Sequence, residues 1–228
     1  MRTPLTARGQ RTRQRLVEAA EAEFAELGYE RASISGIVGR AEVAQGTFYV
    51  YFEDKKTIFV ELVDSLGARL RAVLSQAVRG CQSRLEIERE GLRAFLHFTA
   101  EHRGLYRIVP QAEFVDEECY QRYYRTLAKG YAAGLSLAMK RGELRELDPE
   151  VLAHCLMGIN DMIGLNFVLG RPRVRIDALV EQVMDFVSHG VALRGARKAP
   201  GPGAAKSNPK AGPKTKSNGT APGSRRGP

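Results

Sequence analysis

The residues with the most distinctive chemistry lie between positions 33 and 56, in the stretch SISGIVGRAEVAQGTFYVYFEDKK. Gln45 and Thr47 carry amide and hydroxyl groups. Tyr49 and Tyr51 add phenols, and Lys55 adds an ammonium group. Side chains of these types exchange hydrogen bonds with base edges and phosphate oxygens. The chemistry that this stretch could perform is therefore the non-covalent recognition of a polar, grooved surface such as duplex DNA.

Two short helices must position these groups. Apolar residues at helical spacing (Ile37, Val38 and Ala41) predict a first helix over about residues 35–40, with its apolar side turned inward. A turn follows, and a second helix opens at Gln45 with Phe48 and Phe52 anchoring it from below. This register is that of a helix-turn-helix. The outer face of the second helix is then formed by Gln45, Gly46, Thr47, Tyr49, Val50 and Tyr51.

The segment 13–59 resembles the N-terminal domain of the TetR family of bacterial helix-turn-helix transcriptional repressors. The matching stretches are TRQRLVEAAEAEFAELGY (12–29), IVGRAEV (37–43) and GTFYVYF (46–52), with Lys55 three positions on. The resemblance implies that the second helix enters the major groove of a pseudo-palindromic operator. It assigns phosphate contacts to Arg8, Arg11, Ser33, Tyr49, Tyr51 and Lys55, and base-edge contacts to Gln45, Thr47 and Val50, with Gly46 beside them.

Some of these assignments have alternatives that the sequence leaves open. Ser33 is also placed to cap the first short helix, and one hydroxyl can serve both roles. Tyr49 and Tyr51 could instead shield the small core, and Lys55 could be a solvated surface charge.

Three positions depart from the family pattern. Glu42 stands where a turn glycine is usual, so it must tolerate a positive φ. Ala44 replaces the residue that would cap the recognition helix, and Gly36 replaces an acidic residue. Together these departures predict a slightly looser reading head.

The rest of the chain predicts helices and no strand. Apolar residues recur at helical spacing over 58–81, 85–102, 116–141, 151–169 and 176–193, and the first helix of the chain is expected to be capped by Thr12 and to end at residue 27. The fold class is thus all-α: a three-helix N-terminal helix-turn-helix domain on a larger C-terminal helical bundle, about nine helices, with a disordered C-terminal tail. The predicted domains are 1–56 for DNA binding, 57–195 for effector binding and dimerisation, and 196–228 as a basic tail rich in Pro, Gly, Ala and Lys.

The net charge of +9 in 228 residues does not by itself indicate a nucleic-acid coat. The basic residues after position 196 have no acidic residue among them, and further arginines cluster in the N-terminal arm. The basic charge therefore lies at the two ends of the chain. The tail could add sequence-independent affinity for DNA, or it could be a passive solubilising segment.

The resemblance also implies that the helices after residue 57 bind a small-molecule effector and pair two subunits into a homodimer. Segments 151–169 and 176–193 correspond to the pairing helices, with Val183 and Val187 expected at the interface. An aromatic and mostly uncharged pocket would suit an apolar or aromatic effector, such as an acid or acyl thioester whose head group meets His102 or an arginine. The expected effector-binding residues are Phe95, Phe98, His102, Tyr106, Phe114, Tyr120, Tyr123, Tyr124, Asn160 and Phe167.

Other classes of function find less support. His154 and Cys155 are adjacent on a helix and diverge by about 100°, so they form no nucleophile–base pair. The sequence contains no phosphate-binding loop, no nucleophile-elbow motif, and no cofactor or paired-cysteine metal motif, which argues against an enzyme. His97 and Glu101 could share a weak metal site or an ion pair.

The remaining features point to a cytoplasmic protein. Three widely spaced cysteines suit reduced thiols, although a redox sensor stays possible. We expect no export signal and no apolar run as long as a membrane span. A related fold that organises DNA or protein partners without any effector is a third alternative, which a solidly packed interior would favour.

Overall fold

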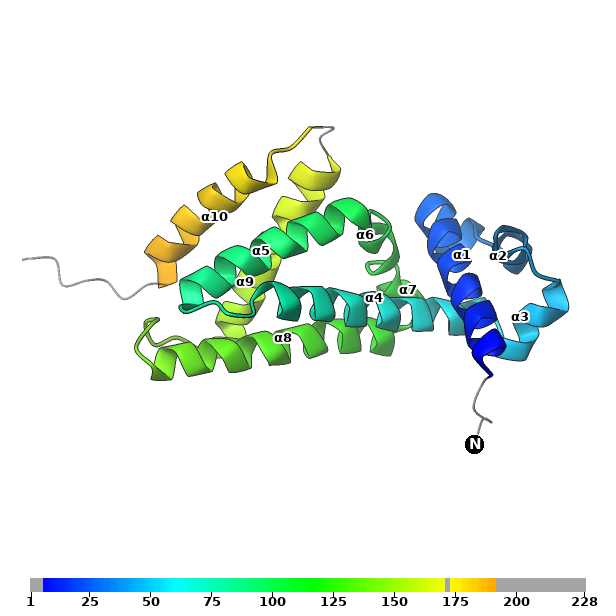
Figure 1. Cartoon of the computed structure of the whole chain (residues 1–228), viewed down its shortest axis with the longest axis horizontal. Helices are drawn as coiled ribbons and strands as arrows, with labels where there is room; N and C mark the ends of the chain where they lie inside the picture. Colours follow the sequence, from blue (N-terminus) through cyan, green and yellow to red (C-terminus); the bar gives the residue numbers. More distant parts are fainter. Residues whose placement is uncertain (1–5, 171–172, 192–228) are drawn as a thin grey trace, which may run out of the picture. The chain divides into compact units, whose positions relative to one another are not determined.

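The computed structural model describes residues 6–170 and 173–191, and over these ranges every regular element is helical (Figure 1). The predicted all-α class is confirmed. The predicted tail, 196–228, lies outside the described residues. In chain order the elements are α1 (Ala7–Arg31), α2 (Ile34–Ala41), α3 (Gln45–Tyr51), α4 (Lys55–Ala77), α5 (Arg84–Glu101), α6 (Leu105–Ile108), α7 (Ala112–Val115), α8 (Glu117–Lys140), α9 (Pro149–Ile163), the π-helical segment η1 (Gly164–Leu169) and α10 (Ile176–Val191).

The first three helices close over a small aromatic core. Phe24 of α1, Phe48 of α3 and Phe52 after α3 are fully buried. Phe59, from the first turns of α4, meets Phe24 edge-on with ring centroids 5.2 Å apart. Because α4 continues without a break across the predicted boundary at residues 56 and 57, it belongs both to this core and to the bundle that follows.

The start of α1 differs from the prediction. Thr6, and not Thr12, caps the helix by accepting a hydrogen bond from the Gly9 backbone N–H (3.2 Å). The Thr12 hydroxyl instead donates to the Arg8 carbonyl oxygen one turn earlier (3.1 Å). At the other end, Gly28 has a non-helical φ of +76° and the chain then continues as helix to Arg31. The predicted helix began too late. Thr12 lies inside the helix, where its hydroxyl bonds to a carbonyl oxygen one turn earlier, and so it does not act as the cap.

The remaining helices form the body of the described chain. Helix α4 packs against α5 and α8, α9 packs against α8, and α10 packs against α5. Asp148 caps α9 with Pro149 in its first turn, as the sequence predicted. Asp54 caps α4 in the same way, and its hydrogen bonds with Thr57 hold the pKa of its carboxyl below the ordinary value.

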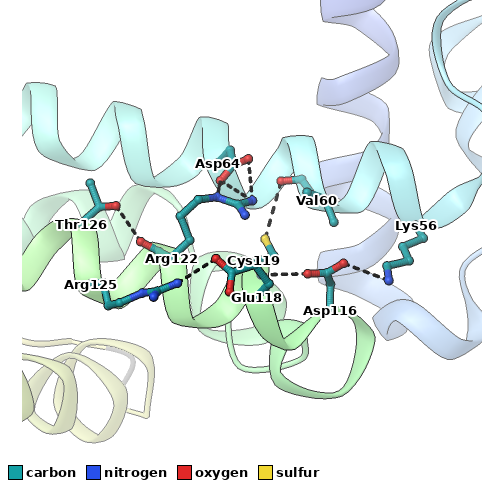
Figure 2. A network of polar contacts seen from close by, with 9 residues as sticks. All are labelled: Lys56, Val60, Asp64, Asp116, Glu118, Cys119, Arg122, Arg125 and Thr126. Atoms are coloured by element: carbon teal, nitrogen blue, oxygen red, sulfur yellow. Dashed lines mark hydrogen bonds and ion pairs between the residues drawn. The ribbon is translucent and has the colours of Figure 1, made fainter.

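Polar contacts fix α8 beside α4 (Figure 2). Asp116 accepts a hydrogen bond from the Cys119 backbone N–H at the start of α8 (2.8 Å) and pairs with Lys56 of α4 (2.9 Å). The Lys56 ammonium, followed by that backbone N–H, lowers the pKa of Asp116. Further along, Arg122 pairs with Asp64 of α4 (3.0 Å).

The cysteines form no disulfide in the described part of the chain. Burial raises the pKa of the Cys119 thiol to about 11, so this thiol is protonated at neutral pH. A protonated thiol is a poor nucleophile, which argues against redox sensing at Cys119.

One expectation about membranes needs correction. The continuous segment formed by α9 and η1 is long and apolar enough, by length and composition, to cross a membrane. The sequence predicted this segment as a buried helix that is apolar almost all round. One such helix is weak evidence for a membrane span, and here one side of it packs against α8 and α5.

Candidate nucleic-acid interface and ligand cavity

Helix α3 presents an exposed face of the predicted composition. Tyr49 is 54% exposed and Val50 is 72% exposed. Gln45 and Gly46 are also exposed, while Thr47 is half-buried. Phe48, on the inner side of α3, is fully buried in the core, and this anchors the helix with the other face outward.

Tyr51 departs from the other residues of that face. It is half-buried and packs against the hydrophobic core, as the alternative interpretation held for it. Tyr49 makes an edge-on contact with Phe48, with ring centroids 5.4 Å apart, but its ring remains largely accessible. The two tyrosines therefore differ: Tyr49 is available to a partner and Tyr51 is partly structural.

The turn between α2 and α3 has the strained residue that the sequence predicted. Glu42 adopts a left-handed conformation, with φ 51° and ψ 48°. Arg15 of α1 donates hydrogen bonds to the carbonyl oxygens of Ala41 (2.5 Å) and Glu42 (3.5 Å), which ties the turn to α1. Ala44 provides no side-chain cap for α3, also as predicted.

Gly36 lies where another residue occupies the space that a side chain would need. A Cβ at this position would lie 2.0 Å from a carboxylate oxygen of Glu23 in α1. The buried Glu23 pairs with Arg40 of α2 through the Arg40 Nε atom (2.7 Å). Gly36 thus permits a close approach of α1 and α2, so the prediction of a looser head receives no support here.

The predicted phosphate contacts at the flanks have different surroundings. Ser33 accepts a hydrogen bond from the Gly36 backbone N–H (3.0 Å), so the capping role is confirmed, and the residue stays exposed. Arg8 and Arg11 are exposed on the first turns of α1. Their contact with DNA, and that of Ser33, stays a prediction.

Lys55 has partners within the chain that the sequence did not predict. Its ammonium donates to the carbonyl oxygens of Tyr29 (2.8 Å), Ala32 (3.0 Å) and Glu30 (3.4 Å). It also lies 4.3 Å from the centroid of the Tyr29 ring. An ammonium group has three donors, and these contacts use them. Lys55 thus holds the end of α1, and its contact with a phosphate stays a prediction.

The body contains a cavity of about 460 Å³ between α4, α5, α6, α8 and α9. Its walls are mainly apolar and aromatic, with a few charged groups. They comprise Leu70, Arg71, Leu74, Ser75, Val78, Arg84, Ile87, Glu88, Gly91, Phe95, Tyr106, Val109, Pro110, Tyr123, Tyr124, Thr126, Leu127, Gly130, Tyr131, Met157, Asn160 and Asp161. A cavity of this size and composition suits a small organic molecule.

The structure brings only part of the predicted effector set to this cavity. Its walls include Phe95, Tyr106, Tyr123, Tyr124 and Asn160. That these residues bind an effector stays a prediction.

The others lie elsewhere and are corrected here. His102 stacks on the buried Phe98 (4.3 Å between centroids) and turns its Nδ1 atom to Glu21 of α1 (3.5 Å). Phe114 is 87% exposed on α7. Tyr120 packs on Tyr124 without reaching the wall, and Phe167 is also absent from it. Helical spacing shows which residues share a face of a helix but not which neighbour that face meets.

Sequence reasoning missed the charged groups of the wall. Arg84 and Glu88 form a buried ion pair (2.6 Å), and the Tyr131 hydroxyl donates to Glu88. Burial, with the Glu88 carboxylate as a second cause, raises the pKa of Tyr131. A basic and an acidic residue four positions apart usually form a solvated pair, so their spacing contains no signal of their burial. Among the described residues, no group of His, Cys, Asp or Glu could hold a metal ion.

Asp161 is a further charged group of the wall, and it was not among the predicted effector-binding residues. Burial raises the pKa of its carboxyl to about 6. The signal was present, because an acid on the most apolar helix of the chain needs a partner or a function.

The short helix α6 connects the cavity to the head. Tyr106 and Val109 line the cavity. Between them, the Arg107 guanidinium donates to the Ala25 carbonyl oxygen of α1 (2.8 Å). The Gln111 side chain accepts from the Tyr29 backbone N–H at the end of α1 (2.6 Å). The cavity and the head, the unit formed by α1, α2 and α3, thus share one wall.

Comparison with known proteins agrees with this architecture. The chain is 30% identical over 191 residues to the HTH-type transcriptional regulator TtgR of Pseudomonas putida, covering 77% of this chain and 89% of that protein. It is 28% identical over 198 residues to the uncharacterized HTH-type transcriptional regulator YdgC of Bacillus subtilis, covering 84% and 98%.

Solved structures share the fold. The fatty acid degradation regulator FadR of Bacillus halodurans superposes with a TM-score of 0.70 at 21% identity, covering 81% of this chain and 96% of that one. FadR of Bacillus subtilis, solved in complex with stearoyl-CoA, gives 0.68 at 22% identity, covering 78% and 98%. The family model for bacterial regulatory proteins of the tetR family matches residues 16–62. With this head, this body and these relatives, the chain belongs to the TetR family of bacterial transcriptional regulators and not to a class of enzymes.

Proposed function

We propose that this protein is a homodimeric repressor, released from a palindromic operator by a small apolar or aromatic effector. DNA recognition is assigned to 1–56 and effector binding with dimerisation to 57–195, in the cytoplasm. The observation that carries the ligand response is the wall shared by the cavity and the head, formed by α6 and the residues that follow it.

DNA recognition is assigned to the exposed face of α3. Gln45, Thr47 and Val50 would meet base edges, with Gly46 allowing a close approach. Tyr49, Arg8, Arg11 and Ser33 would hold phosphates, and Tyr51 would do so only with its accessible edge. The tail could add affinity but lies outside the described residues.

Dimerisation is assigned to an apolar face formed by Val151 and Met162 of α9, Leu165 of η1 and Phe186 of α10, which we call the dimer face. All these side chains are exposed in the single chain, and Phe186 is 71% exposed. An exposed apolar surface of this kind favours burial against a second copy. Val183 and Val187, the residues expected at the interface from the sequence, are not part of this face. Both are buried in their own subunit, where α10 packs against α5.

The effector is assigned to the cavity of about 460 Å³. A solidly packed body would have favoured a DNA-organising protein without an effector, and a cavity of this size favours a ligand. The stearoyl-CoA of the Bacillus subtilis FadR structure belongs to that protein, and at 22% identity the likeness establishes the fold alone. The walls of this cavity must therefore define its own ligand.

The switch follows from the position of α6. Half-sites one helical turn apart require the two reading heads to lie about 34–36 Å apart. A ligand that contacts Tyr106 and Val109 would move Arg107 and Gln111, which hold α1. The operator is released if the ligand binds the altered spacing more tightly than the DNA-bound spacing.

The assignment is tested in two steps. Footprinting on genomic fragments should reveal a protected palindrome, and Gln45→Ala should change the preferred sequence by about 1–3 kcal/mol at one position of each half-site. Glu18→Ala, an exposed change on α1, is the control and should leave the preference unchanged. A protein that protects no palindrome would not be an operator-binding repressor.

The second step concerns release by a panel of apolar and aromatic compounds. Tyr124→Leu should reduce sensitivity to any releasing compound while operator affinity stays within a few-fold. Phe98→Leu is the matched control, because Phe98 is buried near the head and not on the cavity wall. Equal loss of response in both variants would place the ligand elsewhere.

A further inference from the structure

One end of the cavity, which the proposed function assigns to the effector, holds a carboxylate without a partner. Asp161 of α9 lines the cavity, and its carboxylate oxygens make no hydrogen bond or ion pair with any residue that the structure describes. Burial raises the pKa of its carboxyl to about 6, and no basic group of the wall lowers that pKa. At neutral pH the cavity therefore contains an ionised group that only a ligand or water can satisfy.

Three tyrosines share the cavity wall with this carboxylate: Tyr106 of α6 and Tyr123 and Tyr124 of α8. The charge of Asp161, after burial, contributes to raising the pKa of each of their hydroxyls. Aromatic faces beside a carboxylate attract a cation.

The Tyr106 hydroxyl is a second polar group without a partner. It is buried and makes no hydrogen bond within the described ranges. A hydrogen-bonding influence of Thr99 lowers the pKa of Tyr106, but the Thr99 hydroxyl donates to the Phe95 carbonyl oxygen (2.9 Å), and the two hydroxyls do not meet hydrogen-bond geometry. The Tyr106 hydroxyl also lies against Gly164, where a Cβ would be only 2.2 Å from it. An oxygen in this position can accept a hydrogen bond from a ligand.

The other charged groups of the wall do not neutralise Asp161. Arg84 is paired with Glu88 (2.6 Å), and the pair has no net charge. Arg71 of α4 lines the cavity near Tyr123, whose pKa it lowers, and it has no such effect on Asp161. The end of the cavity formed by α6 and α9 is therefore negative.

We propose that the effector is a protonated primary or secondary amine with an apolar or aromatic body. Its ammonium group donates to the Asp161 carboxylate and to the Tyr106 oxygen, with the Asn160 side chain beside them. Its apolar part lies along Phe95 and Tyr124. A fatty acid in the same orientation would bring a second carboxylate to Asp161 and would be repelled.

Three probes that differ only in their head group test this inference on the full-length protein: 4-phenylbutylamine, 4-phenylbutan-1-ol and 4-phenylbutanoate. Binding is measured by titration calorimetry at pH 7.5. The amine should bind at least about tenfold more tightly than the alcohol, as expected for a charge-assisted hydrogen bond. Asp161→Asn should remove that advantage and leave the affinity for the alcohol within about twofold. Glu146→Gln, an exposed change, is the control for the loss of one negative charge.

The pH dependence provides an independent readout. Because the free carboxyl has a pKa of about 6, the affinity for the amine should be constant above that pH and fall about tenfold per unit below it. Asp161→Asn should abolish this decrease, since the amine itself stays protonated throughout.

Other outcomes would overturn the inference. Preferential binding of 4-phenylbutanoate that depends on Arg71, or amine binding unchanged in Asp161→Asn, would show that the ligand is not recognised as a cation. Failure of all three probes to bind at millimolar concentration would have the same consequence. Operator affinity, measured in parallel, separates the proposals: release by the acid alone would leave the proposed function intact, whereas tight amine binding without release would contradict the switch and not the ligand class.

Discussion

At the scale of the residue, the clearest case is Lys55. A lysine just after a recognition helix fits a phosphate contact by motif, yet its ammonium lies against the carbonyl oxygens that end α1. Lys55→Met keeps the apolar stem and should destabilise the protein by about 1–3 kcal/mol, because buried carbonyl groups lose a charged donor. Urea unfolding measures this.

The matched variant is Arg11→Ala, an exposed change on α1. It should leave stability within about 0.5 kcal/mol, weaken binding to all DNA sequences about equally, and reduce the salt slope by about one unit. If Lys55→Met produced the effects expected for Arg11→Ala, the phosphate assignment of Lys55 would be restored.

Asp161 predicts a pH effect on the stability of the unliganded protein. Its pKa is about 6 in the folded chain against an ordinary value of 3.8, so between these values the folded state holds more protons than the unfolded state. The free energy of unfolding should therefore fall as the pH rises from about 4 to about 6. Asp161→Asn should remove this loss and stabilise the protein by roughly 2–3 kcal/mol at pH 7.5.

Urea unfolding at pH 4 and pH 7.5 checks this prediction. A variant that is no more stable than the parent at pH 7.5 would show that the carboxylate is solvated in the free protein. The expected gain would explain Asp161 as a group retained for binding at the expense of stability.

At the scale of the element, the turn between α2 and α3 combines strain with compensation. Glu42 has a left-handed backbone, which costs a residue with a Cβ about 1 kcal/mol relative to glycine. Arg15 offsets part of this cost by donating to the carbonyl oxygens of the turn, contacts that do not depend on the Glu42 side chain.

Glu42→Gly should consequently raise the melting temperature, because it removes the strain and retains the Arg15 contacts. The ion pair between Arg15 and Glu42 spans 3.8 Å at an exposed position and contributes little. Glu42→Ala is the control, since it removes the carboxylate but keeps the Cβ, and it should give no increase. Equal stabilisation by both variants would mean that charge, not backbone conformation, limits the turn.

At the scale of the whole molecule, α10 separates packing within a subunit from pairing between subunits. Val183 is 9% exposed and Phe186 is 71% exposed on the same helix. Phe186→Glu should give a folded monomer with weakened operator binding, because a charge in the dimer face is costly only when a second copy covers it.

Val183→Glu should instead give insoluble or unfolded protein, since the charge would be buried against α5 within the chain. Sedimentation velocity and circular dichroism distinguish these outcomes. A parent protein that sediments as a monomer at micromolar concentration would contradict the dimer.

The sequence alone determined the features that depend on local spacing. Helical periodicity predicted the all-α fold, the residues of the helix-turn-helix motif predicted the exposed face of α3, and side-chain caps such as Ser33 predicted helix ends. Even the left-handed conformation of Glu42 followed from its position in the motif. These properties are set by neighbours within a few residues, which the sequence lists in order.

The tertiary structure decided what each helix faces. Periodicity shows that a helix has an apolar side but not which neighbour covers it. Val183 therefore packs within its own subunit, and Phe98 and His102 lie off the cavity wall. The buried Arg84–Glu88 pair looked like a surface pair because only contacts distant in sequence remove its solvent. The partners of Lys55 likewise come from a helix distant in sequence. Whether a charged group is solvated, paired or available to a ligand depends on helices that come together only when the chain folds.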